Sequence, residues 1–308
     1  MDLSAEERGK FHENPAAFLA KAVKEHAAAS AANRLPEYKN EPVIAAPLIG
    51  FADGRDPLFH EYKKKEIIGD FHLTPEEALV TYLERQQKKA PDKPLEAVSV
   101  ISIAFTPSRE TRLSNPANAR MASPRWSQAY GSAFGLMQET LSYMVSLLET
   151  AGQTAVAPAC TRPMSIKISP EGLPYTDWSE KHAAYAAGLG TFGLHTSLIT
   201  PKGIPLHIGS IITDLALTPT PRVYDNRRVH CRYYSDDSCR ICAEHCPSGA
   251  VDTGVFDGKK CMAYTREELP KVSRQLYGES RPGEHPMCAL CQIRVPCEVG
   301  VPRATQNM

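Results

Sequence analysis

The residues best suited to chemistry in this chain of 308 residues are its cysteines. There are nine, and eight of them fall within residues 231–297. A C-x2-C-x3-C-P motif begins at Cys239, and a second C-x2-C pair begins at Cys288. In proteins that hold two iron–sulfur clusters with this spacing, the cysteine before the proline serves the other cluster. The pattern therefore predicts two 4Fe-4S clusters.

Eight cysteines make two sets of four thiolates, and the interlocking order of the motif assigns them. The first set comprises Cys231, Cys239, Cys242 and Cys297. The second set comprises Cys246, Cys261, Cys288 and Cys291. The motif usually has one more cysteine at the position that Asp236 occupies in this chain. Cys231 could loop back to provide the missing ligand. Alternatively, Asp236 could supply an oxygen ligand, or one iron site could stay open. Two zinc sites of four thiolates each are the alternative to clusters.

Two weaker signals favour structural roles. Gly188, Gly190 and Gly193 match the G-x-G-x-x-G of dinucleotide sites, which needs a strand before it and a helix after it. Here a helical stretch precedes the glycines, so we expect them to end a helix and to let a flat group approach the backbone. Cys160, the ninth cysteine, is expected to be a buried structural thiol.

The elements that must position these residues follow from capping signals and apolar periodicity. Helices are predicted over 15–31, 74–89, 124–152 and 179–187. Strands are predicted over 97–105, 154–159 and 207–213, and a loop over a site is predicted at 106–124. The alternation predicts an α/β or α+β domain over 1–218. Pro219 and Pro221 mark a boundary to a cysteine-rich domain over 219–308 that metal would help to fold.

Charge and apolar content exclude several classes of protein. Lys and Arg number 35 and so do Asp and Glu, so no net positive field attracts nucleic acid or an anionic membrane. No apolar run is long enough to span a bilayer, and no leader peptide begins the chain. We therefore expect a cytoplasmic protein in a reducing compartment, where clustered thiols bind metal more often than they form disulfides.

Several stretches resemble one superfamily in order. Residues 182–198 read HAAYAAGLGTFGLHTSL and resemble the AGLGWxGKHTLL segment of epoxyqueuosine reductases. Residues 201–217 resemble the next segment of those enzymes, and the cysteines follow in their order. The chain is similar to the superfamily of epoxyqueuosine reductases and reductive dehalogenases. This resemblance implies a nitroreductase-like domain that binds base-off cobalamin, followed by a ferredoxin-like two-cluster domain.

The resemblance also implies roles for individual residues. Asp177 would be the catalytic proton donor, its pKa raised by an apolar corrin face, and Tyr130 would be an active-site tyrosine. The segment that wraps the corrin would supply Gly190, Gly193, His195, Thr196 and Ser197, with His195 bonding to the cofactor without ligating cobalt. The end of the next strand would add Thr213 and Asp214.

The implied reaction is reductive removal of oxygen or halide from a small organic substrate, with electrons from a ferredoxin or flavodoxin. The chain departs from the pattern at Leu194, where the epoxyqueuosine reductases carry lysine. It also stops soon after the cysteines, without a C-terminal helical-repeat domain, and this together with its neutral charge argues against tRNA as substrate. The alternative is an iron–sulfur electron-transfer protein that reduces a partner, for example a corrinoid protein, and has no substrate of its own.

Overall fold

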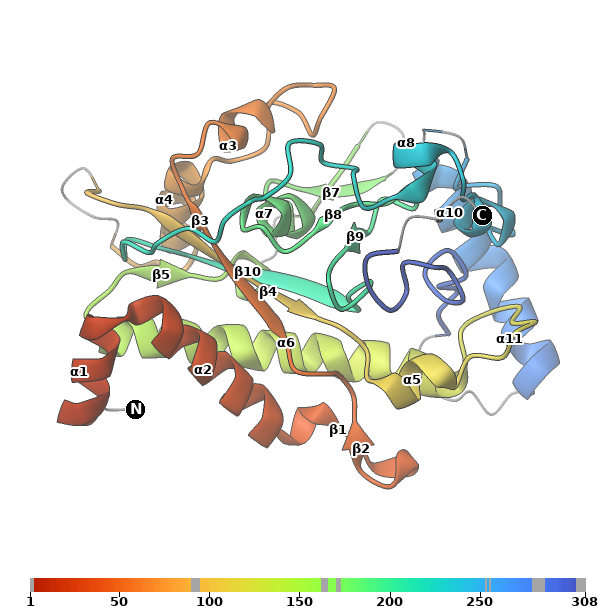
Figure 1. The fold of residues 1–308 in the computed structure, drawn as a ribbon, viewed down its shortest axis with the longest axis horizontal. Coiled ribbons are helices and arrows are strands. Elements are labelled where there is room, and N and C mark those ends of the chain that lie inside the picture. Colours follow the sequence, from red (N-terminus) through yellow and green to blue (C-terminus); the bar gives the residue numbers. More distant parts are fainter. Residues whose placement is uncertain are drawn as a thin grey trace.

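A four-stranded antiparallel sheet forms the centre of the protein, with strands in the order β3-β4-β10-β5 (Figure 1). These strands are β3 (Leu48–Asp53), β4 (Ser99–Phe105), β5 (Ala155–Val156) and β10 (His207–Thr213). The predicted mixed fold is confirmed, and it is of the α+β kind because every neighbouring pair of strands is antiparallel. This computed structural model describes residues 3–89, 95–161, 166–169, 173–252, 254, 256–278 and 286–302.

The two central strands have the composition that a sheet covered on both faces requires. All seven residues of β4 are buried, as its run of β-branched and apolar residues predicts. Strand β10 runs antiparallel to it, with Ile211 opposite Ile101 and His207 opposite Phe105. The predicted strand over 207–213 is confirmed residue for residue, whereas the strand predicted over 154–159 shortens to the two residues of β5.

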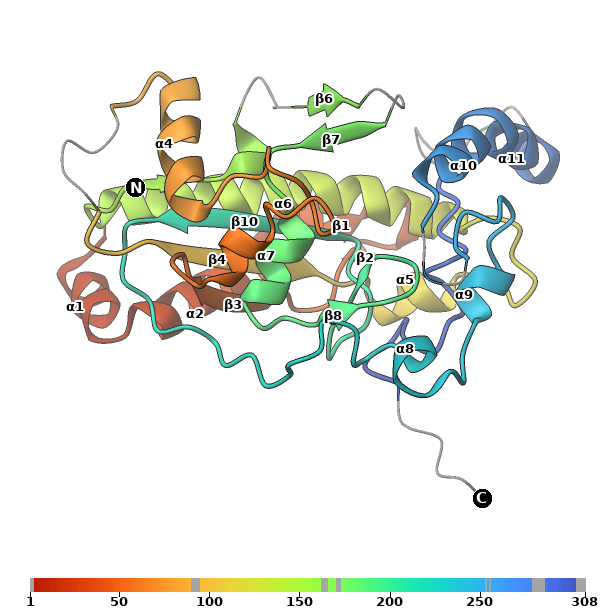
Figure 2. The same ribbon diagram turned by 90° about the horizontal axis from the view of Figure 1, so that it is seen from above.

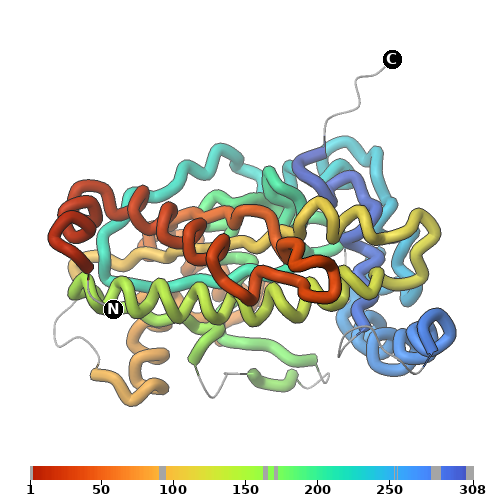
Figure 3. Tube along the Cα trace, turned by 90° about the horizontal axis from the view of Figure 1, so that it is seen from below, coloured from red at the N-terminus to blue at the C-terminus, as the bar shows by residue number. Residues whose placement is uncertain are grey.

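One face of the sheet is covered by α6 (Pro124–Thr150), with α2 (Pro15–Ala29) and α1 (Ala5–Glu13) packed beside it (Figures 1 and 3). The N-cap of α6 is Ser123, whose Oγ accepts the backbone N–H of Trp126. Leu136, Leu141 and Met144 are fully enclosed on its sheet-facing stripe. Helix and sheet approach closely at Gly209, where a Cβ would lie 2.6 Å from Leu141 Cδ1.

The opposite face carries α4 (Pro75–Arg85), α7 (Glu180–Ala186) and the short α3 (Leu58–Glu61) (Figure 2). The predicted capping box of α4 is present, since Thr74 and Glu77 exchange side-chain and backbone hydrogen bonds. The predicted cap of α7 is not present, because Ser179 Oγ pairs with His182 Nδ1 at 2.8 Å instead of with a helix N–H. Helix α7 therefore begins without a side-chain cap.

A proline-flanked segment lies along the outer edge of β3. The backbone N–H of Thr220 donates to the Phe51 carbonyl at 2.9 Å, and Thr220 Oγ1 accepts the Phe51 N–H at 3.0 Å. The segment between Pro219 and Pro221, predicted as a boundary, thus packs against the sheet that precedes it.

The cysteines lie at one end of the sheet in a lobe of short helices, which Figure 2 shows in blue. These helices are α8 (Arg232–Asp236), α9 (Ile241–Glu244), α10 (Gly258–Ala263) and α11 (Leu269–Tyr277). The lobe shares a core with the hairpin of β8 (Thr191–Phe192) and β9 (Leu198–Ile199). Because this core crosses residue 219, the division into two domains stays a prediction.

The remaining elements lie around the sheet. Helix α5 (Arg109–Leu113) falls inside the segment predicted as a loop, so that prediction was too coarse. Two short antiparallel pairs complete the fold: β1 (Arg34–Leu35) with β2 (Glu41–Pro42), and β6 (Ile166–Ile168) with β7 (Pro174–Thr176). In the part of the chain that the structure describes, none of the helices combines the length and apolar character needed to cross a bilayer.

Candidate functional site

Four of the predicted cluster ligands line one small cavity next to the β8–β9 hairpin. This first thiol group comprises Cys231, Cys239, Cys242 and Cys297. The alternative ligand Asp236 is not among the lining residues, because its carboxylate accepts hydrogen bonds from the backbone N–H and the Oγ of Ser238. The space between the thiols is therefore faced by Cys231 and not by Asp236.

His195 places a hydrogen-bond donor against one of these sulfurs. Its Nδ1 accepts the backbone N–H of Ser197 at 3.1 Å. Burial lowers the pKa of the imidazole to about 4, so the neutral ring carries its proton on Nε2. This Nε2 lies 3.4 Å from Cys297 Sγ. An N–H directed at sulfur fits a thiolate acceptor, which is the form of cysteine that binds metal.

The other four predicted ligands form a second thiol group, which comprises Cys246, Cys261, Cys288 and Cys291. Burial raises the pKa of Cys291 to about 12, and the charges of its three partners raise it further. The charge of Cys242, from the first group, also raises the pKa of Cys291. The two thiol groups are therefore neighbours, close enough for their charges to interact.

Among the residues that the structure describes, no three His, Cys, Asp or Glu side chains gather closely enough to hold a single metal ion. The choice between two clusters and two zinc ions therefore depends on the motif, whose C-x2-C-x3-C-P spacing is that of two-cluster ferredoxins.

Burial opposes ionisation of several metal-free thiols. It raises the pKa of Cys242 to about 12 and that of Cys288 to about 11. Cys246 differs: desolvation opposes its ionisation, but hydrogen bonds from Ser248 and the following backbone outweigh this and lower its pKa. Metal ligation requires thiolates, so loading of these groups must release protons.

Asp177 lies away from the thiols, buried between α4 and the start of α7. Its carboxylate accepts the Tyr82 hydroxyl at 2.7 Å and Arg85 Nη2 at 2.6 Å. The guanidinium forms an ion pair with this carboxylate, and the role of Asp177 as proton donor stays a prediction. These contacts connect two segments 92 residues apart and support a structural role.

Five of the predicted corrin contacts lie in or directly beside the β8–β9 hairpin. A Cβ at Gly190 would collide with the Ile199 carbonyl, and one at Gly193 would lie 2.6 Å from the His195 ring. The flat group that approaches these glycines is therefore the protein itself. Ser197 Oγ accepts Gln292 Nε2 at 3.1 Å, which ties the turn to the segment between Cys291 and Cys297.

A cavity of about 300 Å³ borders this turn. Gly193 and Thr196 line it, and the backbone of Thr196 has φ +59. Lys181, Arg227 and Arg228 are its basic residues, and Glu66 is its acidic one. A negative charge on Cys291 would favour the protonated form of Lys181. This cavity therefore lies near the second thiol group.

Thr213 and Asp214 are not among the described residues that line this cavity. Thr213 ends β10 and His207 begins it. Asp214 Oδ1 accepts the backbone N–H of Thr154 at 2.8 Å, which fixes the end of the sheet. The cobalamin assignment stays a prediction.

Tyr130 lines a different cavity of about 760 Å³, which lies along α6. His207 and Met287 share this wall. The sequence analysis missed both residues, although His207 begins a correctly predicted strand and Met287 directly precedes Cys288. No local pattern marks either one, because the cavity forms only when segments distant in the chain come together.

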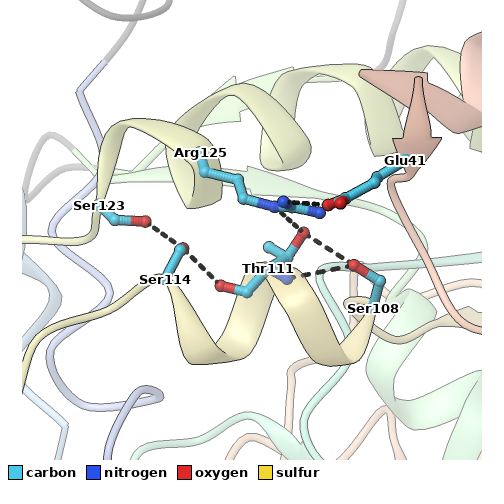
Figure 4. Close-up of polar contacts among 6 residues, drawn as sticks. All are labelled: Glu41, Ser108, Thr111, Ser114, Ser123 and Arg125. Carbon is cyan, nitrogen blue, oxygen red and sulfur yellow. Dashed lines mark hydrogen bonds and ion pairs between the residues drawn. The ribbon is translucent and has the colours of Figure 1, made fainter. Parts of the chain in front are cut away.

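A polar network fixes the N-terminal end of α6 (Figure 4). The Arg125 guanidinium pairs with Glu41 of β2 and donates from Nε to Thr111 Oγ1 at 3.4 Å. Ser114 and Ser123 are hydrogen-bonded through their hydroxyls at 2.6 Å. The network connects β2, α5 and α6 and so fixes the β1–β2 hairpin beside the cavity that Tyr130 lines.

Comparisons with known proteins give partial matches. No protein-family model matches the sequence. A protein from Geobacillus stearothermophilus described as an uncharacterized protein in the gldA 3' region is 32% identical over 103 residues, which cover 30% of this chain and 39% of that protein.

Matches to solved structures cover a larger part of the chain. The chain is similar to epoxyqueuosine reductases and to a reductive dehalogenase. The Bacillus subtilis epoxyqueuosine reductase is 18% identical with a TM-score of 0.48, over 83% of this chain and 62% of that one. The Streptococcus thermophilus enzyme is 14% identical with a TM-score of 0.49, over 85% and 65%.

A catabolic reductive dehalogenase in complex with 3-bromo-4-hydroxybenzoic acid is 16% identical with a TM-score of 0.45, over 66% of this chain and 26% of that one. The chain thus spans less than two thirds of the length of each of these relatives. Identities of this size leave the activity to be argued from the residues of this chain.

Proposed function

We propose that the chain is an iron–sulfur oxidoreductase that holds two 4Fe-4S clusters on its two thiol groups and delivers electrons to a small organic substrate. The observation that carries this proposal is the arrangement of the first thiol group, in which four cysteines from two distant segments face one enclosed space. The C-x2-C-x3-C-P spacing of the motif favours clusters over two zinc ions.

The residues of the chain would do three things around such clusters. The thiolates would bind the iron, which when bound takes up and releases electrons one at a time. The N–H of His195 would stabilise negative charge on Cys297. The neighbouring positions of Cys242 and Cys291 would keep the two groups close enough to exchange electrons supplied by a ferredoxin or flavodoxin.

Reductive removal of oxygen or halide with cobalamin is the finer proposal, and it comes from the resemblance. Its residues on this chain would be those of the turn between β8 and β9, and we derive no step through a corrin. Titration of cluster-loaded protein with cobalamin tests it, and a base-off spectrum with micromolar affinity, equivalent to about 8 kcal/mol, is the expected result. A base-on spectrum, or no binding in this range, would count against it.

A second candidate is an electron-transfer protein that reduces a partner. It requires only the two thiol groups, because a carrier needs no cofactor cavity beyond the clusters. Reduced protein that passes electrons to a corrinoid partner but consumes no small substrate would select this candidate.

Iron and sulfide content tests the clusters themselves. Anaerobically reconstituted protein should hold about eight irons and eight sulfides, and Cys231→Ala should retain about half. Cys160→Ala is the matched control, because Cys160 is not a predicted ligand and its Sγ lies 3.5 Å from the Gln138 carbonyl on α6. This variant should leave the iron content unchanged. Stoichiometric zinc without sulfide would refute the proposal.

A further inference from the structure

The cavity of about 760 Å³ along α6 has the size and walls of a site for a small organic molecule. Its volume lies in the range of drug-sized ligand sites, and aromatic and aliphatic side chains form most of the wall. The residues that matter to the argument are Leu35, Tyr130, Gly131, Phe134, His207 and Met287. Phe134 is 38% exposed, so a large aromatic ring faces an open space.

His207 presents a hydrogen-bond acceptor to this cavity. Its Nε2 lies 2.9 Å from the backbone carbonyl of Tyr130, which can only accept, so Nε2 carries the proton. Burial lowers the pKa of His207 to about 4, which keeps the ring neutral and leaves Nδ1 as a bare acceptor. Among the described residues Nδ1 has no partner, and it is not one of the side-chain atoms enclosed by protein.

Tyr130 adds a flat wall and a hydroxyl group beside this acceptor. Its ring centroid lies 4.2 Å from that of His207, with the planes tilted by 48°. Desolvation raises the pKa of Tyr130, so the hydroxyl stays neutral. Trp126 stacks behind it at 5.6 Å, which holds the ring in place.

The charge of the wall limits the ligand further. Neither lysine nor arginine is among the described residues that line the cavity. Its one acidic residue, Glu37, is already hydrogen-bonded by Gln128 Nε2. An anionic ligand would lose its hydration without gaining a counter-charge from the described residues, so this part of the wall favours uncharged over anionic molecules.

We propose that this cavity binds an uncharged, planar ring compound that donates an N–H hydrogen bond to His207 Nδ1. The aromatic wall would stack on the ring, and Nδ1 would discriminate against isosteres that lack the donor, because it would be left unpaired.

The cavity also lies beside the second thiol group. Met287 is on its wall and precedes Cys288, and the Met287 N–H donates to Ser127 Oγ, on the same wall, at 3.3 Å. A molecule in the cavity would thus contact Met287, and the next residue in the chain, Cys288, is a predicted cluster ligand. That the bound compound is the substrate rests on the proposed function, whereas the binding itself does not.

The experiment uses indole and benzofuran, which have the same shape and differ in the N–H donor. Isothermal titration of the cluster-loaded protein should show indole binding at least tenfold more tightly than benzofuran. His207→Phe should abolish this preference. Indole-2-carboxylate should bind more weakly than indole.

Two glycines of α6 supply a matched pair of variants. Gly131 lines the cavity and Gly135 lies one turn further on, outside it, and a Cβ at either position would meet nothing within 4 Å. Gly131→Met should fill the cavity and weaken indole binding at least tenfold, whereas Gly135→Met should leave it unchanged. Both replace a helix-interior glycine, so neither is expected to destabilise the fold.

Equal affinities for indole and benzofuran, an unchanged affinity in Gly131→Met, or no indole binding at millimolar concentration would overturn the proposal. The iron content of the same samples separates this outcome from failure of the proposed function. Full iron without indole binding contradicts the cavity proposal alone, whereas absent iron contradicts the clusters.

Discussion

At the scale of single residues, His195 should tune one cluster. Its neutral ring donates from Nε2 to Cys297, and hydrogen bonds to ligand sulfur stabilise the reduced, more negative state. His195→Leu should therefore lower the reduction potential of the cluster on the first thiol group. The shift should be about 40 mV, which corresponds to about 1 kcal/mol for a one-electron couple.

Redox titration followed by electron paramagnetic resonance measures this shift. His195→Gln, which retains an N–H donor, should restore most of the potential. His26→Leu is the control, because His26 stacks on Tyr143 and belongs to α2, remote from the thiols. An unchanged potential in His195→Leu protein with full iron content would contradict the assignment.

A buried carboxyl group at the start of α7 should make stability depend on pH. Desolvation raises the pKa of Glu180 from 4.5 to about 8, although Ser210 donates a hydrogen bond to it at 2.5 Å. Between these values the folded state holds a proton that the unfolded state has lost. The free energy of unfolding should therefore fall as pH rises through this window, by about 1.4 kcal/mol per pH unit from this group.

Glu180→Gln should remove that contribution. The difference in unfolding free energy between variant and parent should grow in favour of the variant from pH 4.5 to 8, as measured by chemical denaturation. Glu84→Gln, an exposed change on α4, is the control and should give a constant difference. A pH-independent difference for Glu180→Gln would show that its carboxyl group ionises normally.

At the scale of elements, the network in Figure 4 predicts an asymmetry between two variants. The Arg125 side chain is 10% exposed and its Nη2 already lacks a partner among the described residues, whereas Glu41 is 38% exposed. Glu41→Gln leaves a buried cation without its counter-charge and should cost about 2–4 kcal/mol of unfolding free energy. Arg125→Met leaves a carboxylate that water can solvate, and should cost about 1 kcal/mol or less.

Urea denaturation under anaerobic conditions measures both values. Glu25→Gln breaks the exposed pair of Glu25 with Lys21 and is the matched control, with an expected effect below about 0.5 kcal/mol. If Arg125→Met proves the more damaging of the two, the guanidinium contributes through packing and not through its charge.

The helices and strands differ in how well the sequence alone predicts them. Helices α2, α4 and α6 were predictable because Asn14, Thr74 and Ser123 cap them through bonds to residues within one turn. Helix α1 carries a similar capping box at Ser4, a local signal that the sequence analysis did not use. The antiparallel strand order was not predictable, because hydrophobic runs do not specify which strands pair.

In the candidate site, too, only the features that depend on neighbouring residues in the sequence were predictable. The four cysteines that line one cavity were grouped correctly from their spacing in the sequence, whereas the cluster ligation of all eight stays a prediction. Asp177 acquires its partner Arg85 through packing of segments 92 residues apart, and His207 reaches Tyr130 across 77 residues. Such contacts depend on tertiary structure, which a linear pattern does not contain.

At the scale of the whole molecule, removal of the metal should loosen one end of the protein. The core shared by the β8–β9 hairpin and the cysteine lobe contains Cys231, Cys242 and Cys297, so part of its cohesion would come from ligation. The two cores on either face of the sheet contain none of these three cysteines.

Chelation of iron should therefore increase protease cleavage within residues 231–302, while fragments spanning α6 and the sheet persist. Limited proteolysis with mass spectrometry of the fragments measures this, and the cluster-loaded protein is the control. Cleavage distributed evenly along the metal-free chain would indicate one cooperative unit.

The segment that lies along β3 has a consequence for how the protein behaves in a crowded solution. An uncovered edge strand offers its free backbone groups to any other extended chain and so invites aggregation. Thr220 occupies those groups on Phe51, and the prolines at 219 and 221 have no N–H with which to recruit a further strand. The connection to the cysteine lobe thus also shields this edge of the sheet at Phe51, and lengthening that connection should raise the tendency of the protein to aggregate.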